Sequence, residues 1–312
     1  MTQNKHNRRR ALLAIPLLVI TLLALAVGCP DDLNAVDRIP VCVSIVPQAY
    51  FVQQIGMDMV NIQVMVPPGA SPETYEPRPA QMKDLGDARL YFSLGVPFET
   101  VWLNKIVSMN PDIKIVRTDK GIQKRTMEAH ACGESSRDLH HHHDSVSIPE
   151  NSADPHIWLS PALVMSQAGM ILRGLQEADP DRREAYEKNY RTFMLRLQDL
   201  DTLLKQLFAD SRGSRFMVLH PAWGYFADDY GLIQIPVEVE GKAPKPAQLK
   251  QIIDFARQHS LNVMLVQPQS TANWVKQVAD AIHGQVVYAD PLAPDWEKNL
   301  TDVAAKIKTA LR

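Results

Sequence analysis

Residues 179–213 read DPDRREAYEKNYRTFMLRLQDLDTLLKQLFADSRG, and the pattern of this stretch decides how the chain is organised. Asp179 followed by Pro180 is typical of a helix start, and Ser211 with Gly213 predicts its end. Between them apolar side chains recur at spacings of three and four, which traces one stripe along a helix. The stripe consists of Tyr186, Tyr190, Phe193, Leu197, Leu200, Leu204 and Leu207. About thirty helical residues extend roughly 45 Å, enough to run across two lobes.

Two blocks of alternating strand-like and helix-like segments flank this helix. Their candidate strands are near-continuous apolar runs, which is typical of parallel sheets buried on both faces. They lie at Val41–Val46, Asn61–Val66, Arg89–Leu94, Ile113–Arg117, Phe216–Leu219, Ile233–Val239, Val263–Val266 and Val286–Tyr288. The sequence therefore predicts an α/β fold: two doubly wound parallel-sheet lobes, residues 38–178 and 213–312, joined by one long spanning helix, residues 179–211. A coiled-coil interface is the alternative for this helix, but similar lobes on either side favour the spanning role.

The N-terminus predicts export. A basic region at Lys5–Arg10 precedes an apolar run at Ala11–Val27, which is short for a bilayer span and typical of a signal peptide, residues 1–28. An uncleaved membrane anchor is the alternative. Ala26–Cys29 resembles a bacterial lipobox, in which Cys29 is acylated and tethers the mature protein to a membrane. We therefore expect the protein in the periplasm or on the outer face of the cytoplasmic membrane, anchored by lipid.

Charge and composition restrict the possible functions. Apolar residues make up 46% of the 312 residues and charged residues 22%, which suits a soluble globular protein. Removal of residues 1–28 takes away four of the 33 basic residues and none of the 35 acidic ones, which leaves a formal charge of −6. This mildly acidic body attracts cations weakly and does not favour nucleic acid. The familiar phosphate-loop, zinc-protease and nucleophile-elbow motifs are missing, which disfavours an enzyme.

Residues 119–154 break the alternating pattern. This stretch is polar and has no hydrophobic period, so it predicts a long surface loop. It contains His130, Cys132 and the run His140, His141, His142 and His143. Clustered imidazoles bind zinc, copper or nickel weakly, and a solvated spacer is the alternative. Cys42 lies in an apolar run and is expected in the core, and no spacing argument pairs it with Cys132.

Four possible metal ligands stand at the ends of predicted elements. Glu73 follows the second strand, His156 precedes a helix, His220 ends the strand at Phe216–Leu219, and Asp290 follows the last strand. In open α/β sheets the functional crevice lies beyond the carboxyl ends of the strands, so two candidates from each half could meet in one cleft. Taken singly, each also has a structural explanation, such as a hydrogen-bonded histidine or a turn-forming aspartate.

Five segments resemble those of a known family. They are Pro67–Pro77, Asp154–Leu159, His220–Phe226, Glu240–Pro244 and Asp290–Leu292. In this order they resemble the signature segments of metal-specific (zinc/manganese) periplasmic solute-binding proteins of ABC transporters, the ZnuA/TroA-like family. The resemblance covers nearly everything after residue 38 and implies two α/β lobes joined by one long helix. It also implies that Glu73, His156, His220 and Asp290 are metal ligands, although most members have histidine where this chain has Glu73.

The implied function is capture of a divalent transition metal and its delivery to the membrane permease of an ABC importer. A carboxylate binds zinc at about 2.0–2.2 Å, so Glu73 is compatible with Zn²⁺. Two imidazoles with two carboxylates form a harder set, which favours Mn²⁺ or Fe²⁺ as the alternative. The histidine-rich loop favours zinc. The expected partners are the metal ion, the permease and, through Cys29, the membrane, and the expected state is a monomer.

Other functions are also compatible with these residues. The same fold could serve as a metal-binding adhesin or chaperone. A zinc hydrolase would use Glu73 or Asp290 as a general base. Four protein ligands, however, leave no open coordination position for an activated water, so we expect binding without catalysis.

Overall fold

The computed structural model describes residues 38–127, 153–237, 244–268 and 273–311. Several predictions lie outside these residues: the signal peptide, the lipid-attachment residue Cys29, and His130, Cys132, His140, His141, His142 and His143. Within the described part, no helix has both the length and the apolar character needed to cross a bilayer. Cys42 is buried in the core, as the sequence predicts. Burial, with a smaller contribution from the charge of Asp84, raises its pKa to about 12.

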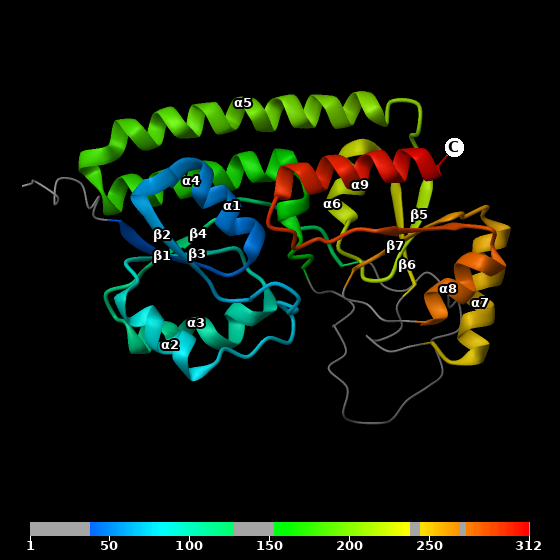
Figure 1. The fold of residues 1–312 in the computed structure, drawn as a ribbon, viewed down its shortest axis with the longest axis horizontal. Coiled ribbons are helices and arrows are strands. Elements are labelled where there is room, and N and C mark those ends of the chain that lie inside the picture. Colours follow the sequence, from blue (N-terminus) through cyan, green and yellow to red (C-terminus); the bar gives the residue numbers. More distant parts are fainter. Residues whose placement is uncertain (1–37, 128–152, 238–243, 269–272, 312) are drawn as a thin grey trace, which may run out of the picture. The chain divides into compact units, whose positions relative to one another are not determined.

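The first lobe is built on a four-stranded parallel sheet with strand order β2-β1-β3-β4. The strands are β1 (Ile39–Val43), β2 (Val60–Val64), β3 (Leu90–Ser93) and β4 (Lys114–Arg117). The helices are α1 (Val46–Gly56), α2 (Pro79–Asp84), α3 (Pro97–Met109) and α4 (Pro161–Ala178). Figure 1 shows α1 and α4 on one face of the sheet and α2 and α3 on the other. Helices on both faces explain why β3 is buried along its whole length.

The second lobe repeats this plan with strand order β6-β5-β7-β8. Its strands are β5 (Arg215–Val218), β6 (Ile233–Pro236), β7 (Val263–Val266) and β8 (Gln285–Tyr288). Its helices are α6 (Gly224–Tyr230), α7 (Pro246–Gln258), α8 (Asn273–Ala281) and α9 (Trp296–Ala310). Side chains alternate across β5: Phe216 and Val218 join the main apolar cluster, whereas Met217 packs with Ile252 of α7 and Val278 of α8. The sheet is therefore covered on both faces.

One long helix, α5 (Arg183–Leu207), contacts α1 and α4 of the first lobe and α6 and α9 of the second (Figure 1). Most of the predicted stripe is buried against them, including Tyr186, Phe193 and Leu204. The prediction of two parallel-sheet lobes joined by a spanning helix is therefore confirmed. The helix is shorter than expected, since its 25 residues extend about 37 Å. It begins four residues later than predicted, after a 3₁₀ turn at Pro180–Arg182, and ends four residues earlier, where the Phe208 carbonyl accepts from the Ser211 amide.

Helix α9, which was not predicted from the sequence, joins the two lobes. Asp295 caps this helix by accepting from the Lys298 amide. Trp296 is 1% exposed, and its ring lies 5.1 Å from that of Phe51 on α1 in an edge-to-face arrangement. One continuous buried apolar cluster therefore contains side chains from both lobes and from α5.

Candidate metal site

Glu73 lies in the loop after β2, and contacts on both sides fix this loop. The Glu73 amide donates to Ser71 Oγ at 3.2 Å, and the Phe98 amide at the start of α3 donates to the Pro72 carbonyl at 3.0 Å. The ring of Tyr75 packs against that of Phe98. α3 thus holds the loop at the carboxyl end of the first sheet, and the Glu73 side chain stays 28% exposed.

His156 lies at the turn that leads into α4 and is 3% exposed. Asp154 Oδ1 accepts from the His156 amide at 2.9 Å and lies 2.8 Å from the ring Nδ1. A carboxylate at Nδ1 favours the tautomer with its proton on that atom, which leaves the Nε2 lone pair for a metal. The Asp154 carboxylate therefore contacts both the backbone and the ring of His156 and orients this proposed ligand.

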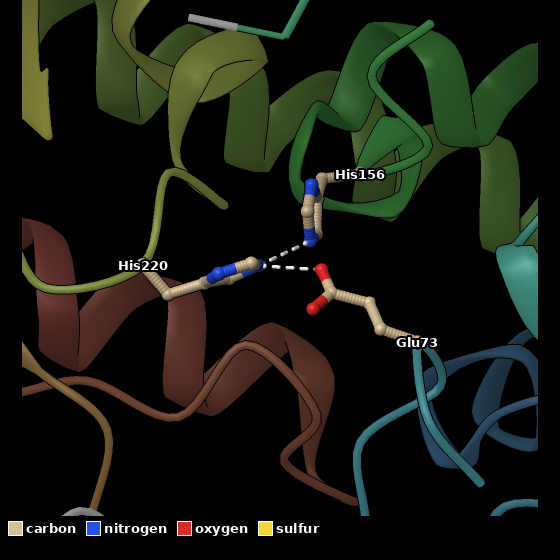
Figure 2. Close-up of side chains that lie close together, drawn as sticks. All are labelled: Glu73, His156 and His220. Atoms are coloured by element: carbon tan, nitrogen blue, oxygen red, sulfur yellow. Dashed lines mark hydrogen bonds and ion pairs between the residues drawn. The ribbon is translucent and has the colours of Figure 1, made fainter. Parts of the chain in front are cut away.

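His220 follows β5 and completes a cluster drawn from both lobes (Figure 2). Its Nε2 atom lies 3.0 Å from Glu73 Oε1 and 3.3 Å from His156 Nε2. The Leu219 amide donates to the Leu265 carbonyl of β7, so the residue before His220 continues the sheet pairing. The carboxyl end of the second sheet therefore holds His220 opposite Glu73 and His156.

The spacing of these three groups fits a metal ion. One ligand atom from each residue lies within 4.8 Å of the other two. A tetrahedral zinc ion with ligand distances of about 2.0–2.2 Å places its ligand atoms roughly 3.3–3.6 Å apart. The separations of 3.0 and 3.3 Å are close to that range, so an ion needs only small side-chain shifts to enter.

The side-chain carboxyl of Glu73 is ionised beside the two histidines. Burial raises the pKa of this carboxyl, but the hydrogen bond and charge of His220 and the charge of His156 lower it by more. The net pKa lies below the ordinary glutamate value, so the group is ionised at neutral pH. Once the two imidazoles are neutral, their ring nitrogens and this carboxylate form a suitable set of zinc ligands.

Asp290, the fourth predicted ligand, lines the same cavity but stands apart from the cluster of three. The cavity has a volume of about 290 Å³, and Glu73, His156, His220 and Asp290 all line it. Asp290 does not belong to the group of side chains whose ligand atoms lie within 4.8 Å of one another. Its Oδ1 accepts from the Leu292 amide at 2.9 Å, which is the turn-forming role that the sequence also allowed. Its role as a ligand stays a prediction.

Two tryptophans support the cavity in a way that sequence reasoning missed. Trp158 packs its ring 5.0 Å from that of His156, and its Nε1 donates to the Pro291 carbonyl at 2.7 Å. Trp296 Nε1 in turn donates to the Trp158 carbonyl at 2.7 Å. The segment that carries His156 is therefore tied to the segment that carries Asp290. Both tryptophans were visible in the sequence, but no spacing rule connects residues so far apart.

A family model described as zinc-uptake complex component A, periplasmic, matches residues 41–310. The chain belongs to this family. This agrees with the resemblance noted in the sequence and with the two-lobed fold. The periplasmic zinc-uptake family is one of solute-binding proteins, so the chain is an extracytoplasmic component of an uptake system.

Individual proteins named for zinc uptake or zinc binding resemble the chain over most of its length. The high-affinity zinc uptake system protein ZnuA of Bacillus subtilis (strain 168) is 28% identical over 254 residues, which is 80% of this chain and 76% of that protein. The zinc-binding lipoprotein AdcA of Streptococcus pneumoniae (strain ATCC BAA-255 / R6) is 27% identical over 250 residues, which is 79% of this chain but 49% of AdcA. A crystal structure of a ZnuA deletion mutant with zinc bound has a TM-score of 0.77 and 39% identity, covering 88% of this chain and 98% of that one.

Proposed function

We propose that this protein captures a zinc ion between its two lobes in the periplasm and delivers it to the permease of an ABC importer. The convergence of Glu73, His156 and His220 from both lobes within 4.8 Å carries the proposal. Asp290, on the wall of the same cavity, is proposed as the fourth ligand after a small rearrangement. The membership of the chain in a zinc-uptake family supports transport as the purpose of this binding.

Zinc is the proposed cargo because of the ligand types and the related proteins. Imidazole nitrogen and carboxylate oxygen both bind zinc well. Relatives of the chain are named as zinc-uptake or zinc-binding proteins, and one similar structure holds zinc. A carboxylate at position 73 makes the set harder, so Mn²⁺ and Fe²⁺ are the ions that must compete in any test.

Binding without catalysis is the proposed role of the site. If Asp290 joins the three clustered side chains, four protein ligands close the coordination shell. A catalytic zinc keeps one position for water or substrate. A further adhesin or chaperone role would use the same site and is not needed to explain the geometry.

A lipid anchor at Cys29 is proposed to hold the protein at the membrane surface, where a permease is within reach. The lipobox-like sequence before Cys29 supports this, and one relative is named a lipoprotein. We further propose a monomer.

The histidine-rich loop is proposed to raise the local zinc concentration. The imidazoles that would do so are those of His130, His140, His141, His142 and His143. Deletion of residues 130–143 should then reduce uptake under zinc starvation.

The decisive experiment is metal content followed by competition. The purified protein is expected to hold one zinc ion, and the apo-protein is expected to prefer zinc when zinc, manganese and iron compete. His156→Ala and His220→Ala should each weaken zinc binding severely. The exposed His259 at the end of α7 provides a matched control, because His259→Ala leaves the cavity intact. Stoichiometric manganese with negligible zinc would refute the choice of metal.

A further inference from the structure

Two backbone segments of the first lobe meet beside His156. The Asp154 amide donates to the Arg125 carbonyl at 2.8 Å, and the neighbouring residues Thr126 and Ala153 form an antiparallel bridge. Asp154 is 1% exposed and contacts His156 through its carboxylate, as described above. Whatever holds these two segments therefore also holds the ring of His156.

A hydroxyl group from the second lobe enters between these segments. Tyr225, on α6, accepts from the Arg125 amide at 3.0 Å and donates to the Asp154 carbonyl at 2.9 Å. A hydroxyl has one donor and two acceptor positions, so both bonds can form at once. Burial raises the pKa of Tyr225 to about 12, and the hydroxyl keeps the proton that it donates.

The Arg125 side chain adds a second connection to α6. Its Nη1 atom lies 3.4 Å from Asp228 Oδ2, and its guanidinium carbon lies 5.9 Å from the centre of the Tyr225 ring. Its Nε atom faces Asp154 Oδ2 at 3.9 Å. A Cβ atom on Gly224 would lie 1.9 Å from Arg125 Nη1, so the guanidinium occupies space that only glycine leaves open.

We propose that Tyr225 and Arg125 are positioning residues for the metal site, which set the distance between His156 and His220. His220 lies five residues before Tyr225 in the second lobe, whereas Asp154 holds His156 in the first. The Tyr225 hydroxyl therefore fixes one histidine relative to the other although neither touches it. This inference rests on the proposed function, because the spacing matters only if the two histidines share an ion.

The test removes one hydroxyl group and compares it with a matched control. Tyr225→Phe keeps the ring and deletes only the group that binds Arg125 and Asp154. Tyr230→Phe does the same on the same helix, where the hydroxyl of a buried tyrosine donates to Asp201 Oδ1 at 3.3 Å. Zinc affinity is measured by chelator competition. The absorption spectrum of the Co²⁺-substituted protein reports ligand geometry, and melting curves of the apo-proteins report stability.

Tyr225→Phe is expected to weaken zinc binding by about tenfold and to shift the Co²⁺ absorption bands. This is the lower end of the range for residues that contact a ligating histidine, because Tyr225 acts on His156 through Asp154. Tyr230→Phe should change neither, even where it lowers the melting temperature. Gly224→Ala, which displaces the Arg125 guanidinium but leaves the Tyr225 hydroxyl, should weaken zinc binding by a smaller factor.

Wild-type affinity and spectrum in Tyr225→Phe would overturn the positioning role, as would equal losses of affinity in Tyr225→Phe and Tyr230→Phe. A failure of the proposed function looks different. In that case His156→Ala binds zinc as tightly as the wild type, and both the site and the inference built on it fall together.

Discussion

Glu73 faces His220 at 3.0 Å and stands where most members of the family that the sequence resembles are expected to have histidine. Its carboxylate supplies a hard oxygen and a negative charge, so it should affect both affinity and metal choice. We expect Glu73→Ala to weaken zinc binding at least tenfold. Glu73→His should shift the metal preference of the site further from manganese towards zinc. Titration of each variant with both metals checks this. Glu76→Ala, an exposed carboxylate in the same loop, is the control. Unchanged zinc affinity in Glu73→Ala would exclude it as a ligand.

The clustering of Glu73, His156 and His220 could be predicted from the sequence, but the contacts that support these residues could not. Glu73, His156 and His220 each follow or precede a regular element, and parallel sheets gather such positions at one edge. Tyr225, by contrast, binds the carbonyl of a residue 71 positions away. Hydrophobic periodicity predicts which side of an element faces the core and gives no distance between side chains of different lobes. The contact therefore depends on packing that only the folded chain provides.

At the level of the elements, the start of α3 is held by a buried carboxylate. Glu99 is 6% exposed and accepts from the Leu94 and Gly95 amides and from Ser44 Oγ. Burial raises its pKa above the ordinary value, against these hydrogen bonds, which lower it. The group therefore stabilises the fold most at pH values below its unfolded pKa, and this contribution is lost as pH rises through the folded pKa.

Comparison of the wild type with Glu99→Gln isolates this contribution, because glutamine does not titrate. We expect the unfolding free energy of the wild type, relative to that of the variant, to fall as pH rises over the interval above about 4.3, the ordinary pKa of glutamate. Urea unfolding of both proteins at several pH values measures the difference. A difference that rises over this interval would mean that the Glu99 pKa is lowered in the folded protein.

α9 obeys the same periodicity as α5, with Trp296, Leu300, Val303 and Ile307 all buried, so the sequence did contain the signal for it. The six residues of α2 are too few for a periodic signal.

Since Trp296 packs against Phe51 of the other lobe, Trp296→Ala should lower the unfolding free energy by about 3–5 kcal/mol. Tyr288→Ala, at a 59% exposed side chain, should change it by less than about 0.5 kcal/mol. Similar losses from both changes would argue against a shared core.

On the scale of the whole molecule, the lobes are joined by more than the linking chain. Arg196 on α5 donates to Gln54 at 2.7 Å and to Tyr50 at 2.6 Å in the first lobe, and it pairs with Glu297 of α9 in the second. With the continuous apolar cluster, this polar contact opposes wide hinge opening. We infer that ion release needs only small tilts or loop movements, which agrees with a site formed where the lobes already meet.

Because the proposed ligands come from both lobes, an ion should stabilise the molecule as a unit. An ion that binds only the folded state adds about 2.7 kcal/mol at a free concentration of 100 times Kd. We therefore expect zinc to raise the melting temperature of the wild type, and a chelator to reverse the change. Hydrogen exchange should slow in both lobes, around the Glu73 loop and around His220.

The controls separate this effect from weak surface binding. Magnesium, which prefers oxygen ligands, should leave the melting temperature unchanged. His220→Ala removes the proposed ligand that faces both Glu73 and His156, so zinc should no longer protect either lobe. Protection confined to one lobe in the wild type would mean that the ion is held by that lobe alone. The two lobes would then not be coupled through the metal, whatever the affinity.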